Sequence, residues 1–372
     1  MAEWIDCKIA DLGTVIGGAT PSTKKLEYYE NGSIAWITPK DLSTFRGRYI
    51  RRGERNITEL GLKSCSTQLL PKNTVLFSSR APIGYIAIAE NELCTNQGFK
   101  SVIPNENTDP LFLYYLLKYN KNKIENMGSG TTFKEISGNT MKNIVVSVPR
   151  DKKVQEQISS MLGVIDNKIE SNEKINNNLE QQAIAIFDNM FPNISAAEKT
   201  IGDIIIPKRG KNLLSKNAIL GNVPVVAGGL NPSTYHNTAN TIAPVLSISA
   251  SGANAGYVNL WNIPIWSSDS SFIDSSMSND VYFWYVLLKK RQNEIYDSQT
   301  GSAQPHIYPQ HIAAMPICDL NFNKVSNYTS TVTPIFELIG HNKIENMRLI
   351  TIRDALVPKL ISGDLDVSNI SL

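Results

Sequence analysis

The chain has 372 residues, with 36 lysines and arginines against 34 aspartates and glutamates, and a formal net charge of +2. Its hydrophobic fraction of 42% with 19% charged residues excludes a disordered chain and a membrane-embedded helical bundle. The four cysteines are scattered without a Cys-x-x-Cys pair, which excludes a zinc ribbon and a disulfide-stapled scaffold. The length corresponds to two domains of roughly 150 residues with a further segment between them.

The N-terminus shows no basic stretch followed by an apolar core, so we expect no signal peptide. No apolar run approaches the ~20 residues that a membrane-spanning helix needs. We therefore expect a cytoplasmic protein that does not contact a membrane.

Residues 1–150 are predicted to form an α+β module. Short β-rich runs between turn signals lie at residues 34–38, 74–78, 83–89 and 144–148. One amphipathic helix is expected at residues 110–124. The module carries 19 basic and 14 acidic side chains, a surplus that favours a polyanionic partner.

Residues 151–192 are predicted to form one long helix, on the order of 55 Å in length, in which Gly163 is the only glycine or proline between residues 153 and 190. Apolar and asparagine side chains alternate spacings of four and three, which is the pattern of a coiled-coil seam. This seam consists of Ile158, Leu162, Ile165, Ile169, Asn172, Asn176, Leu179, Ala183 and Ile186. A long helix lying on a domain surface is the alternative interpretation.

Residues 193–320 repeat the pattern of the first module. The β-rich runs are expected at residues 223–227, 244–248, 255–259 and 263–266, and the helix at residues 280–295. The C-terminal segment, residues 321–372, contains a less regular heptad pattern at about residues 333–360. We expect this segment to pair with the central helix, with Asn172 and Asn176 fixing the register of the pair.

Short sequence matches recur in the same order in the two halves, which indicates an internal duplication. Asn167-Lys168-Ile169-Glu170 recurs as Asn342-Lys343-Ile344-Glu345, and further matches join Val75 with Val245, Gly84 with Gly256, and Gly130 with Gly301. Between Gly32 and Val75 the first copy is nineteen residues longer than the matching interval of the second. This insertion contains Arg46, Arg48, Arg51, Arg52 and Arg55.

Motifs of catalysis and of metal or nucleotide binding are missing from the sequence. There is no P-loop and no GxGxxG, and the four histidines lack the spacing of metal ligands. Asn231-Pro232-Ser233 is interpreted as a turn, and Asp166-Asn167-Lys168 as solvated charge on the long helix. The sequence therefore predicts neither a catalytic site nor a metal site.

Two diverged α+β modules, each followed by a heptad helix with Asn-Lys-Ile-Glu, resemble the specificity subunit of type I restriction–modification enzymes over the whole chain. The most specific shared features are the helix motifs at residues 162–170 (LGVIDNKIE) and 338–345 (LIGHNKIE). The module starts are also shared, at residues 9–13 and 17–21 in the first module and at residues 201–203 and Gly210 in the second. So are the module ends, at residues 128–132 and 148–149 in the first module and at residues 300–302 and 315–316 in the second. The second module departs from the start pattern at residues 208–211 (KRGK), which leaves its DNA-facing residues less defined.

The resemblance implies an α+β fold with two duplicated target-recognition domains, at residues 1–150 and 193–320. Two long helices of the family, at residues 151–192 and 321–372, would separate these domains and form an antiparallel coiled coil. Each domain would read one half of a gapped, bipartite site in double-stranded DNA. The chain itself would be non-catalytic and hold no cofactor.

The resemblance also implies partner subunits. Two methyltransferase subunits would dock on the helices and bring S-adenosylmethionine. Restriction subunits would bring ATP-driven translocation and cleavage, for which Mg is expected on the partners.

Polar surface residues of both modules are the candidates for DNA contact, as phosphate ligands or readers of base edges. In the first module they are Lys24, Lys25, Arg46, Arg48, Arg51, Arg52, Arg55, Arg80, Lys100 and Lys134. In the second module they are Lys208, Arg209, Lys211, Tyr235, His236, Ser251, Asn254, Gln304 and His306. For each single residue, a solvated side chain without a role is the competing interpretation.

Three other functions remain open at this point. A self-contained methyltransferase would need its own S-adenosylmethionine site. A coiled-coil scaffold would join partners without binding DNA. The specificity module of a related bipartite-site enzyme, of the type IIB or IIG kind, would share the DNA-reading role but belong to another assembly.

Overall fold

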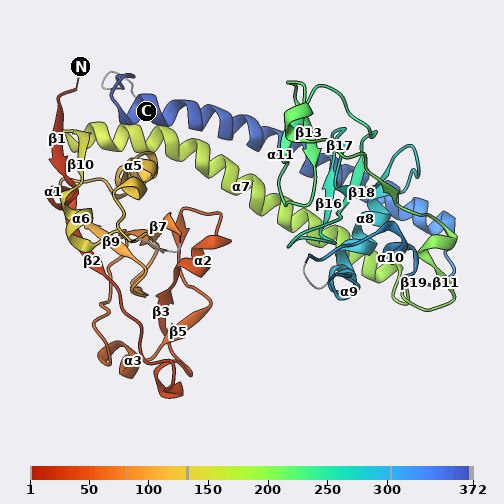
Figure 1. Cartoon of the computed structure of the whole chain (residues 1–372), viewed down its shortest axis with the longest axis horizontal. Helices are drawn as coiled ribbons and strands as arrows, with labels where there is room; N and C mark the ends of the chain where they lie inside the picture. Colours follow the sequence, from red (N-terminus) through yellow and green to blue (C-terminus); the bar gives the residue numbers. More distant parts are fainter. Residues whose placement is uncertain (1, 81, 131–133, 302–303, 368–372) are drawn as a thin grey trace. The chain divides into compact units, whose positions relative to one another are not determined.

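A computed structural model describes residues 2–80, 82–130, 134–301 and 304–367 (Figure 1). The chain divides into two compact units, Met1–Glu170 with Met347–Leu372, and Ser171–Asn346. The boundaries fall inside two long helices, α7 (Lys152–Met190) and α11 (Phe322–Ile361), so each unit contains a part of both. These two units are defined by which residues lie close together in space. The four segments predicted above are defined by changes in composition and periodicity along the sequence, and they stay a prediction.

The first unit contains an α+β module built on two sheets. The larger sheet has the order β2 (Gly13–Gly17), β9 (Lys100–Pro104), β6 (Val75–Ser79), β7 (Ile83–Ala89) and β4 (Tyr49–Ile50). The smaller has the order β5 (Arg55–Ile57), β3 (Ile34–Ile37) and β8 (Cys94–Thr95). A separate ladder joins β1 (Trp4–Lys8) to β10 (Val145–Pro149).

Short helices connect these strands. They are α1 (Ile9–Leu12), α2 (Pro39–Ser43), α3 (Glu59–Lys63), α4 (Pro110–Tyr119), α5 (Lys121–Asn126) and α6 (Gly138–Asn143), with a 3₁₀ turn η1 at Leu26–Tyr28. Helix α4 begins where Asp109 accepts a hydrogen bond from the backbone N–H of Phe112, with Pro110 at the first helical position. Its apolar side chains are buried against the larger sheet.

The hydrophobic core of the first unit continues from the module into both long helices. Phe77 and Ile88 of the sheet and Phe112 of α4 belong to the same buried cluster as Leu162 of α7 and Leu360 of α11. Both chain ends also lie in this unit, and Gly363 packs so closely on the Trp4 indole that a Cβ would come within 2.6 Å of the ring. The unit is therefore assembled from the two ends of the chain.

The second unit repeats this plan. Its larger sheet has the order β12 (Lys208–Arg209), β18 (Ser270–Asp274), β15 (Val245–Ser249) and β16 (Val258–Trp261). The smaller has the order β14 (Thr234–His236), β13 (Val223–Val226) and β17 (Trp266–Ser267). A ladder joins β11 (Lys199–Thr200) to β19 (Pro316–Ile317).

The helices of the second unit also correspond to those of the first. They are α8 (Val281–Lys290), α9 (Gln292–Asp297) and α10 (Pro309–Ala313), with 3₁₀ turns η2 (Ile201–Asp203) and η3 (Ser215–Asn217). The two strand orders are equivalent, including the parallel pairs β3–β8 and β13–β17. Gly84 and Gly256 both adopt positive φ, at 93° and 86°. The internal duplication is thus confirmed, and among the described residues β4 of the arginine-rich insertion has no counterpart.

Several predicted boundaries were wrong. The helices expected at residues 110–124 and 280–295 each break into two, after Tyr119 and Lys290. The strand expected at 255–259 begins at Val258, because Gly256 turns the chain with its positive φ. The C-terminal helix begins at Phe322, one residue after the predicted start, but ends at Ile361, before the predicted end at residue 372, and Pro334 lies within it without ending it.

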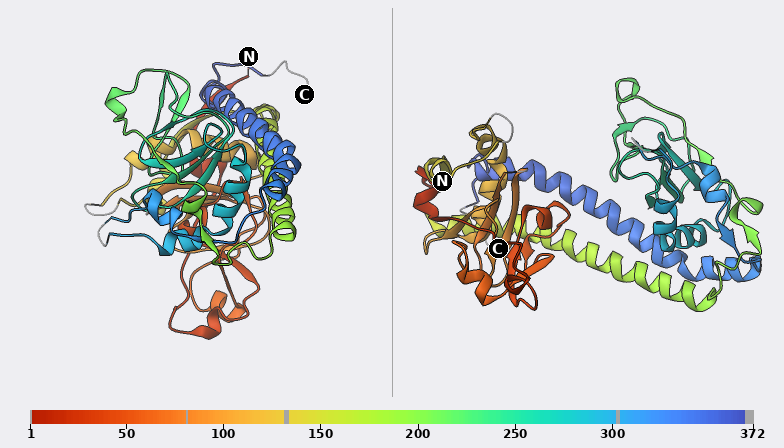
Figure 2. Two further views of the ribbon diagram at one scale, coloured as in Figure 1. Left: turned by 90° about the vertical axis from the view of Figure 1, so that its right-hand side faces the viewer. Right: turned by 60° about the horizontal axis from the view of Figure 1, so that its bottom comes forward.

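Helices α7 and α11 pair in opposite directions in each unit (Figure 2). In the second unit, Asn172 contacts Asn346 and Asn176 contacts Asn342, each with an amide hydrogen bond of 2.8 Å. In the first unit, Asp166 contacts Arg353 at 2.8 Å. Because residue numbers rise on one helix as they fall on the other, the pairing is antiparallel, as predicted.

The predicted seam holds over most of α7 but changes near its end. Ile158, Leu162, Ile169, Asn172 and Ala183 are buried, while Ile165, Asn176, Leu179 and Ile186 are half-buried. After Ala183 the buried position passes to Phe187, which was not predicted. Phe187 packs against the rings of Tyr328 on α11 and Phe283 on α8, with centroids 5.4 and 5.5 Å away. The end of α7 therefore packs against the second module as well as against α11.

Candidate DNA-binding surfaces

Arg48 was predicted as a DNA contact, and the structure places it elsewhere. Its side chain is only 4% exposed, and its Nε donates to Oε1 of Glu170 on α7 at 2.9 Å. The backbone N–H of Arg48 donates to the same oxygen, and Nη2 donates to Glu170 and Asn167. Burial disfavours the charge of Arg48, but the ion pair with Glu170 outweighs it and raises the pKa. Arg48 therefore anchors the insertion on the helix and is withdrawn as a phosphate ligand.

The other arginines of the insertion are exposed. Arg51 and Arg52 directly follow β4, and Arg46 precedes it. The guanidinium carbon of Arg55 lies 4.1 Å from the centre of the Tyr29 ring, a cation–π contact that orients it. With Arg48 fixed to α7, the insertion presents these four cations from an anchored base.

A charged cluster in the first module joins two of the candidates through a residue that the sequence interpretation missed. Nη1 of Arg80 lies 3.7 Å from Glu135, and Nζ of Lys100 lies 3.6 Å from its other carboxylate oxygen. Glu135 forms isolated backbone bridges with Ser129 and with Arg80, which close the glycine-rich loop. Lys134 beside it is exposed. The repeat residues Thr131 and Thr132, and Ser302 in the second copy, lie outside the described residues.

The equivalent cluster in the second module has different chemistry. His306 forms the same two backbone bridges, with Thr300 and with Ser251. Asp269, also missed from the sequence, accepts hydrogen bonds from the Ser251 hydroxyl and from Nη2 of Arg209, the latter at 2.6 Å. Arg80 and Glu135 of one module thus correspond to Ser251 and His306 of the other. The offset of 171 residues between Gly130 and Gly301 joins the same pairs, and the backbone bridges agree with it.

The remaining candidates of the second module are mostly accessible. Lys208, Lys211, Gln304 and Tyr235 are exposed, and Asn254 is half-buried. In the first module Lys24 and Lys25 are exposed in the loop around η1. Their roles in DNA binding stay predictions.

His236 is the second candidate that the structure redirects. It is 6% exposed because it ends β14 at the position that Ile57 occupies in β5, where the side chain points into the module. Its Nδ1 accepts a hydrogen bond of 3.0 Å from the backbone N–H of Ile219. Its ring meets Trp266 edge to face, with centroids 5.0 Å apart. His236 therefore anchors a loop and is withdrawn as a direct reader.

The interpretation of Asp166 as solvated charge is also wrong. Asp166 is buried, and its carboxylate accepts a hydrogen bond of 2.6 Å from the Tyr115 hydroxyl and one of 2.8 Å from Arg353. Burial, and next the negative charge of Asp166, raise the pKa of Tyr115. Asp166 on α7 thus links α4 of the first module to α11.

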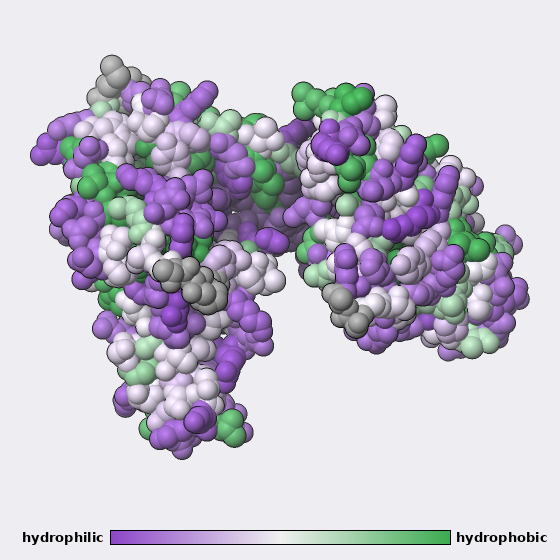
Figure 3. All heavy atoms as spheres, viewed as in Figure 1, coloured by the Kyte–Doolittle hydropathy of each residue, from purple (hydrophilic) through white to green (hydrophobic). Residues whose placement is uncertain are grey.

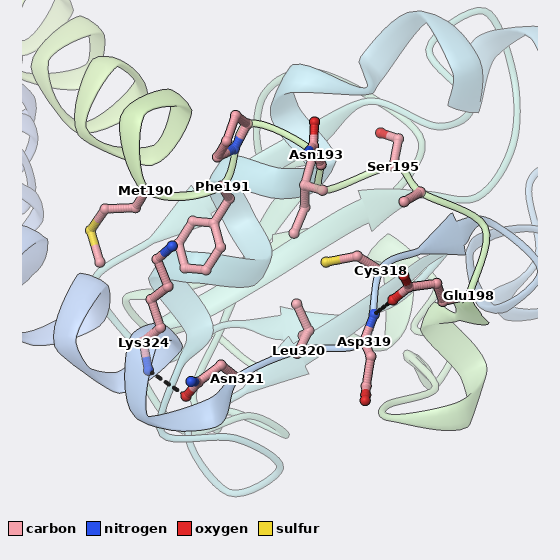
Figure 4. A pocket seen from close by; sticks show the side chains of 13 residues that line it. Met190, Phe191, Asn193, Ser195, Glu198, Cys318, Asp319, Leu320, Asn321 and Lys324 are labelled. Atoms are coloured by element: carbon pink, nitrogen blue, oxygen red, sulfur yellow. Dashed lines mark hydrogen bonds between the residues drawn. The ribbon is translucent and has the colours of Figure 1, made fainter.

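A pocket of about 680 Å³ lies where α7 ends and α11 begins (Figure 4). The chain segments at residues 190–198 and 318–324 line it, and Nζ of Lys324 lies 5.5 Å from the centre of the Phe191 ring. The N–H of Asp319 donates to Glu198 at 2.7 Å across its rim. None of the candidate DNA contacts lines this pocket.

The described residues contain no group of three His, Cys, Asp or Glu side chains close enough to hold a metal ion. They also contain no helix with the length and apolar character to cross a bilayer.

Comparison with known proteins identifies the family. The specificity subunit of the type I restriction enzyme MjaIX from Methanocaldococcus jannaschii is 34% identical over 411 aligned positions, covering 99% of this chain and 95% of that protein. This chain belongs to the type I restriction enzyme specificity subunits. Residues 1–181 match the family described as type I restriction modification DNA specificity domain.

Two further similarities agree. The EcoR124I/EcoR124II specificity subunit of Escherichia coli is 36% identical over 114 positions, or 29% of this chain and 27% of that one. The crystal structure of a type I S subunit from M. genitalium superposes with a TM-score of 0.62 at 20% identity, covering 99% of this chain and 97% of that chain. The latter shows that the specificity subunits share this fold.

Proposed function

We propose that this specificity subunit is the non-catalytic DNA reader of its restriction–modification complex, and that each module reads one half of a bipartite DNA site. One observation carries the proposal. The two modules share one strand order but differ at equivalent surface positions, where Arg80 and Glu135 stand against Ser251 and His306. Two readers with one scaffold and different side chains are suited to two different half-sites.

The partners follow from the same proposal. Two methyltransferase subunits, carrying S-adenosylmethionine, would dock on α7 and α11, and restriction subunits would bring ATP-driven translocation and Mg-dependent cleavage. The antiparallel pairing of α7 with α11 supports this, because it presents two related helical surfaces, each with an Asn-Lys-Ile-Glu motif. The assembly would work in the cytoplasm, where the host DNA lies.

Reconstitution with the methyltransferase subunits of the same system tests the proposal. Methylome mapping of a host carrying the complex should show one asymmetric, gapped motif. The purified chain alone should transfer no methyl group from labelled S-adenosylmethionine. A complex that methylates without this chain, or a chain that methylates alone, would contradict the proposal. Assembly without any preference for DNA sequence would favour the scaffold function.

A further inference from the structure

The loop between β12 and β13 is held in place at both of its ends. The Trp266 indole N–H donates to the carbonyl of Lys211 at 2.8 Å, and the N–H of Leu213 donates to the Ser268 hydroxyl at 2.9 Å. At the other end, Ile219 is held by the ring of His236. Gly210 lies so close to Ser267 that a Cβ would come within 2.5 Å of its carbonyl oxygen. The path of residues 211–219 is therefore fixed by the module beneath it.

This anchored loop presents large apolar side chains to solvent. Leu220 is 95% exposed, Ile219 is 60% exposed and Leu214 is 50% exposed. Figure 3 shows apolar atoms gathered on the second unit where Figure 1 draws the loop that leads into β13. A group of exposed apolar side chains on a fixed loop marks an interaction surface, since folding alone gains nothing from it.

The charge around this loop has one sign. Residues 204–268 contain no aspartate or glutamate, and their lysines and arginines are Lys208, Arg209, Lys211 and Lys216. Arg209 is partly neutralised by Asp269, whereas the three lysines are exposed. Apolar side chains among cations match a partner with anionic edges and an apolar interior. Duplex DNA has this chemistry, with phosphates on the outside and stacked bases between them.

The first module anchors the equivalent loop in the same way. The Trp36 indole N–H donates to the carbonyl of Ala19 at 3.1 Å, and the Tyr29 ring meets Trp36 edge to face. Trp36 lies on β3, whereas Trp266 lies on β17, which corresponds to β8, the parallel partner of β3. The same loop position is therefore held by tryptophans from two non-equivalent strands. The first loop also exposes a leucine, Leu26, beside two lysines. The arrangement therefore occurs twice.

We propose that residues 211–220 form a DNA-contacting loop in which Ile219 and Leu220 enter a groove and make apolar contact with the bases, while Lys211 and Lys216 bind the flanking phosphates. His236 and Trp266 act as positioning residues. This inference rests on the proposed function and names the element by which the second module reads its half-site.

The experiment uses the full chain assembled with its methyltransferase subunits. Binding is measured on a duplex that contains the mapped target and on one with the second half-site scrambled. Leu220→Asn and Ile219→Asn should each weaken target binding about tenfold, as expected for one lost apolar side chain, and leave the scrambled duplex nearly unchanged. Lys216→Gln should weaken both duplexes and lower the salt slope by about one. Val145→Asn, at a valine of β10 that is 46% exposed on a strand without candidate DNA contacts, is the control and should bind as the wild type.

Two results would overturn the inference while leaving the proposed function intact. One is target binding by Leu220→Asn and Ile219→Asn at the wild-type affinity. The other is an equal loss on both duplexes. A wild-type complex that does not distinguish the two duplexes would instead remove the proposed function, and this inference with it.

Discussion

The guanidinium of Arg48 and the carboxylate of Glu170 form a two-pronged ion pair, with Nε and Nη2 donating at 2.9 and 3.1 Å. These residues are 122 positions apart, one in the basic insertion and the other on α7. The pair fixes the insertion to the helix next to Gly163, where a Cβ would stand 3.5 Å from the Arg48 guanidinium. Arg48, the most deeply buried arginine of the insertion, therefore attaches the insertion to α7. The exposed arginines of the insertion stay the candidates for DNA contact.

We expect Arg48→Ala to destabilise the first unit by on the order of 2–3 kcal/mol, because it leaves the largely buried Glu170 carboxylate without its cation. Arg48→Lys should recover only part of this, since an ammonium lacks the planar fork. Thermal unfolding of the full chain followed by circular dichroism measures the change. Arg46→Ala, at an exposed arginine two residues away, is the control. Equal melting temperatures for Arg48→Ala and Arg46→Ala would refute the anchoring role.

Arg51→Ala and Arg52→Ala should weaken DNA binding by the assembled complex about equally on all sequences and make its salt dependence shallower. The reason is that exposed cations on a loop bind phosphates and release counterions. Titrations at several salt concentrations check this. If these variants changed which bases are methylated, the insertion would be a base reader instead.

The amide pair Asn176–Asn342 should contribute a coupling free energy of roughly 0.5–1.5 kcal/mol to the pairing of α7 with α11. A double-mutant cycle with Asn176→Ala and Asn342→Ala, followed by denaturant unfolding, measures it. Additive effects of the two substitutions would show that the amide contact adds nothing. Asn178→Ala, at an exposed position of the same helix, controls for the change in helix propensity.

Burial raises the pKa of the Cys94 thiol to about 11, so its contribution to stability depends on pH at the alkaline end. The neutral thiol is favoured in the folded state, and in the unfolded chain the thiol ionises near its ordinary pKa of 9.0. The contribution should therefore be complete below pH 9 and decline as the pH rises towards 11. The difference in unfolding free energy between wild type and Cys94→Ala, measured from pH 8 to 11, isolates it. A difference that stays constant over this range would contradict the burial of a neutral thiol.

The duplication made most of the fold predictable. Matches as short as Val75 with Val245 and Gly84 with Gly256 located strands β6 and β15 and the positive-φ glycines that follow them, because both copies need the same buried residues and the same backbone conformation. The heptad spacing located α7 to within two residues at each end. The insertion was also visible in sequence, as the interval in which the two copies differ in length.

The side chains withdrawn as DNA contacts could not be identified from local sequence. Arg48 lies among arginines, and only the tertiary position of Glu170 separates it from Arg46 and Arg51. The register of β14 turns His236 inward, and a strand of three residues has too little alternation to show this. Aligning His236 with Ile57 by the strand ladder would have revealed it, but that alignment requires the structure.

The contact of Trp4 with Gly363 closes the first unit from the two ends of the chain. The parts follow one another as module, helix, module and helix, and this contact closes their order into a cycle. A short linker between the ends, with new termini opened at the exposed turn of residues 195–198, should give a permuted chain with the same packing. Seen as a cycle, neither module comes first.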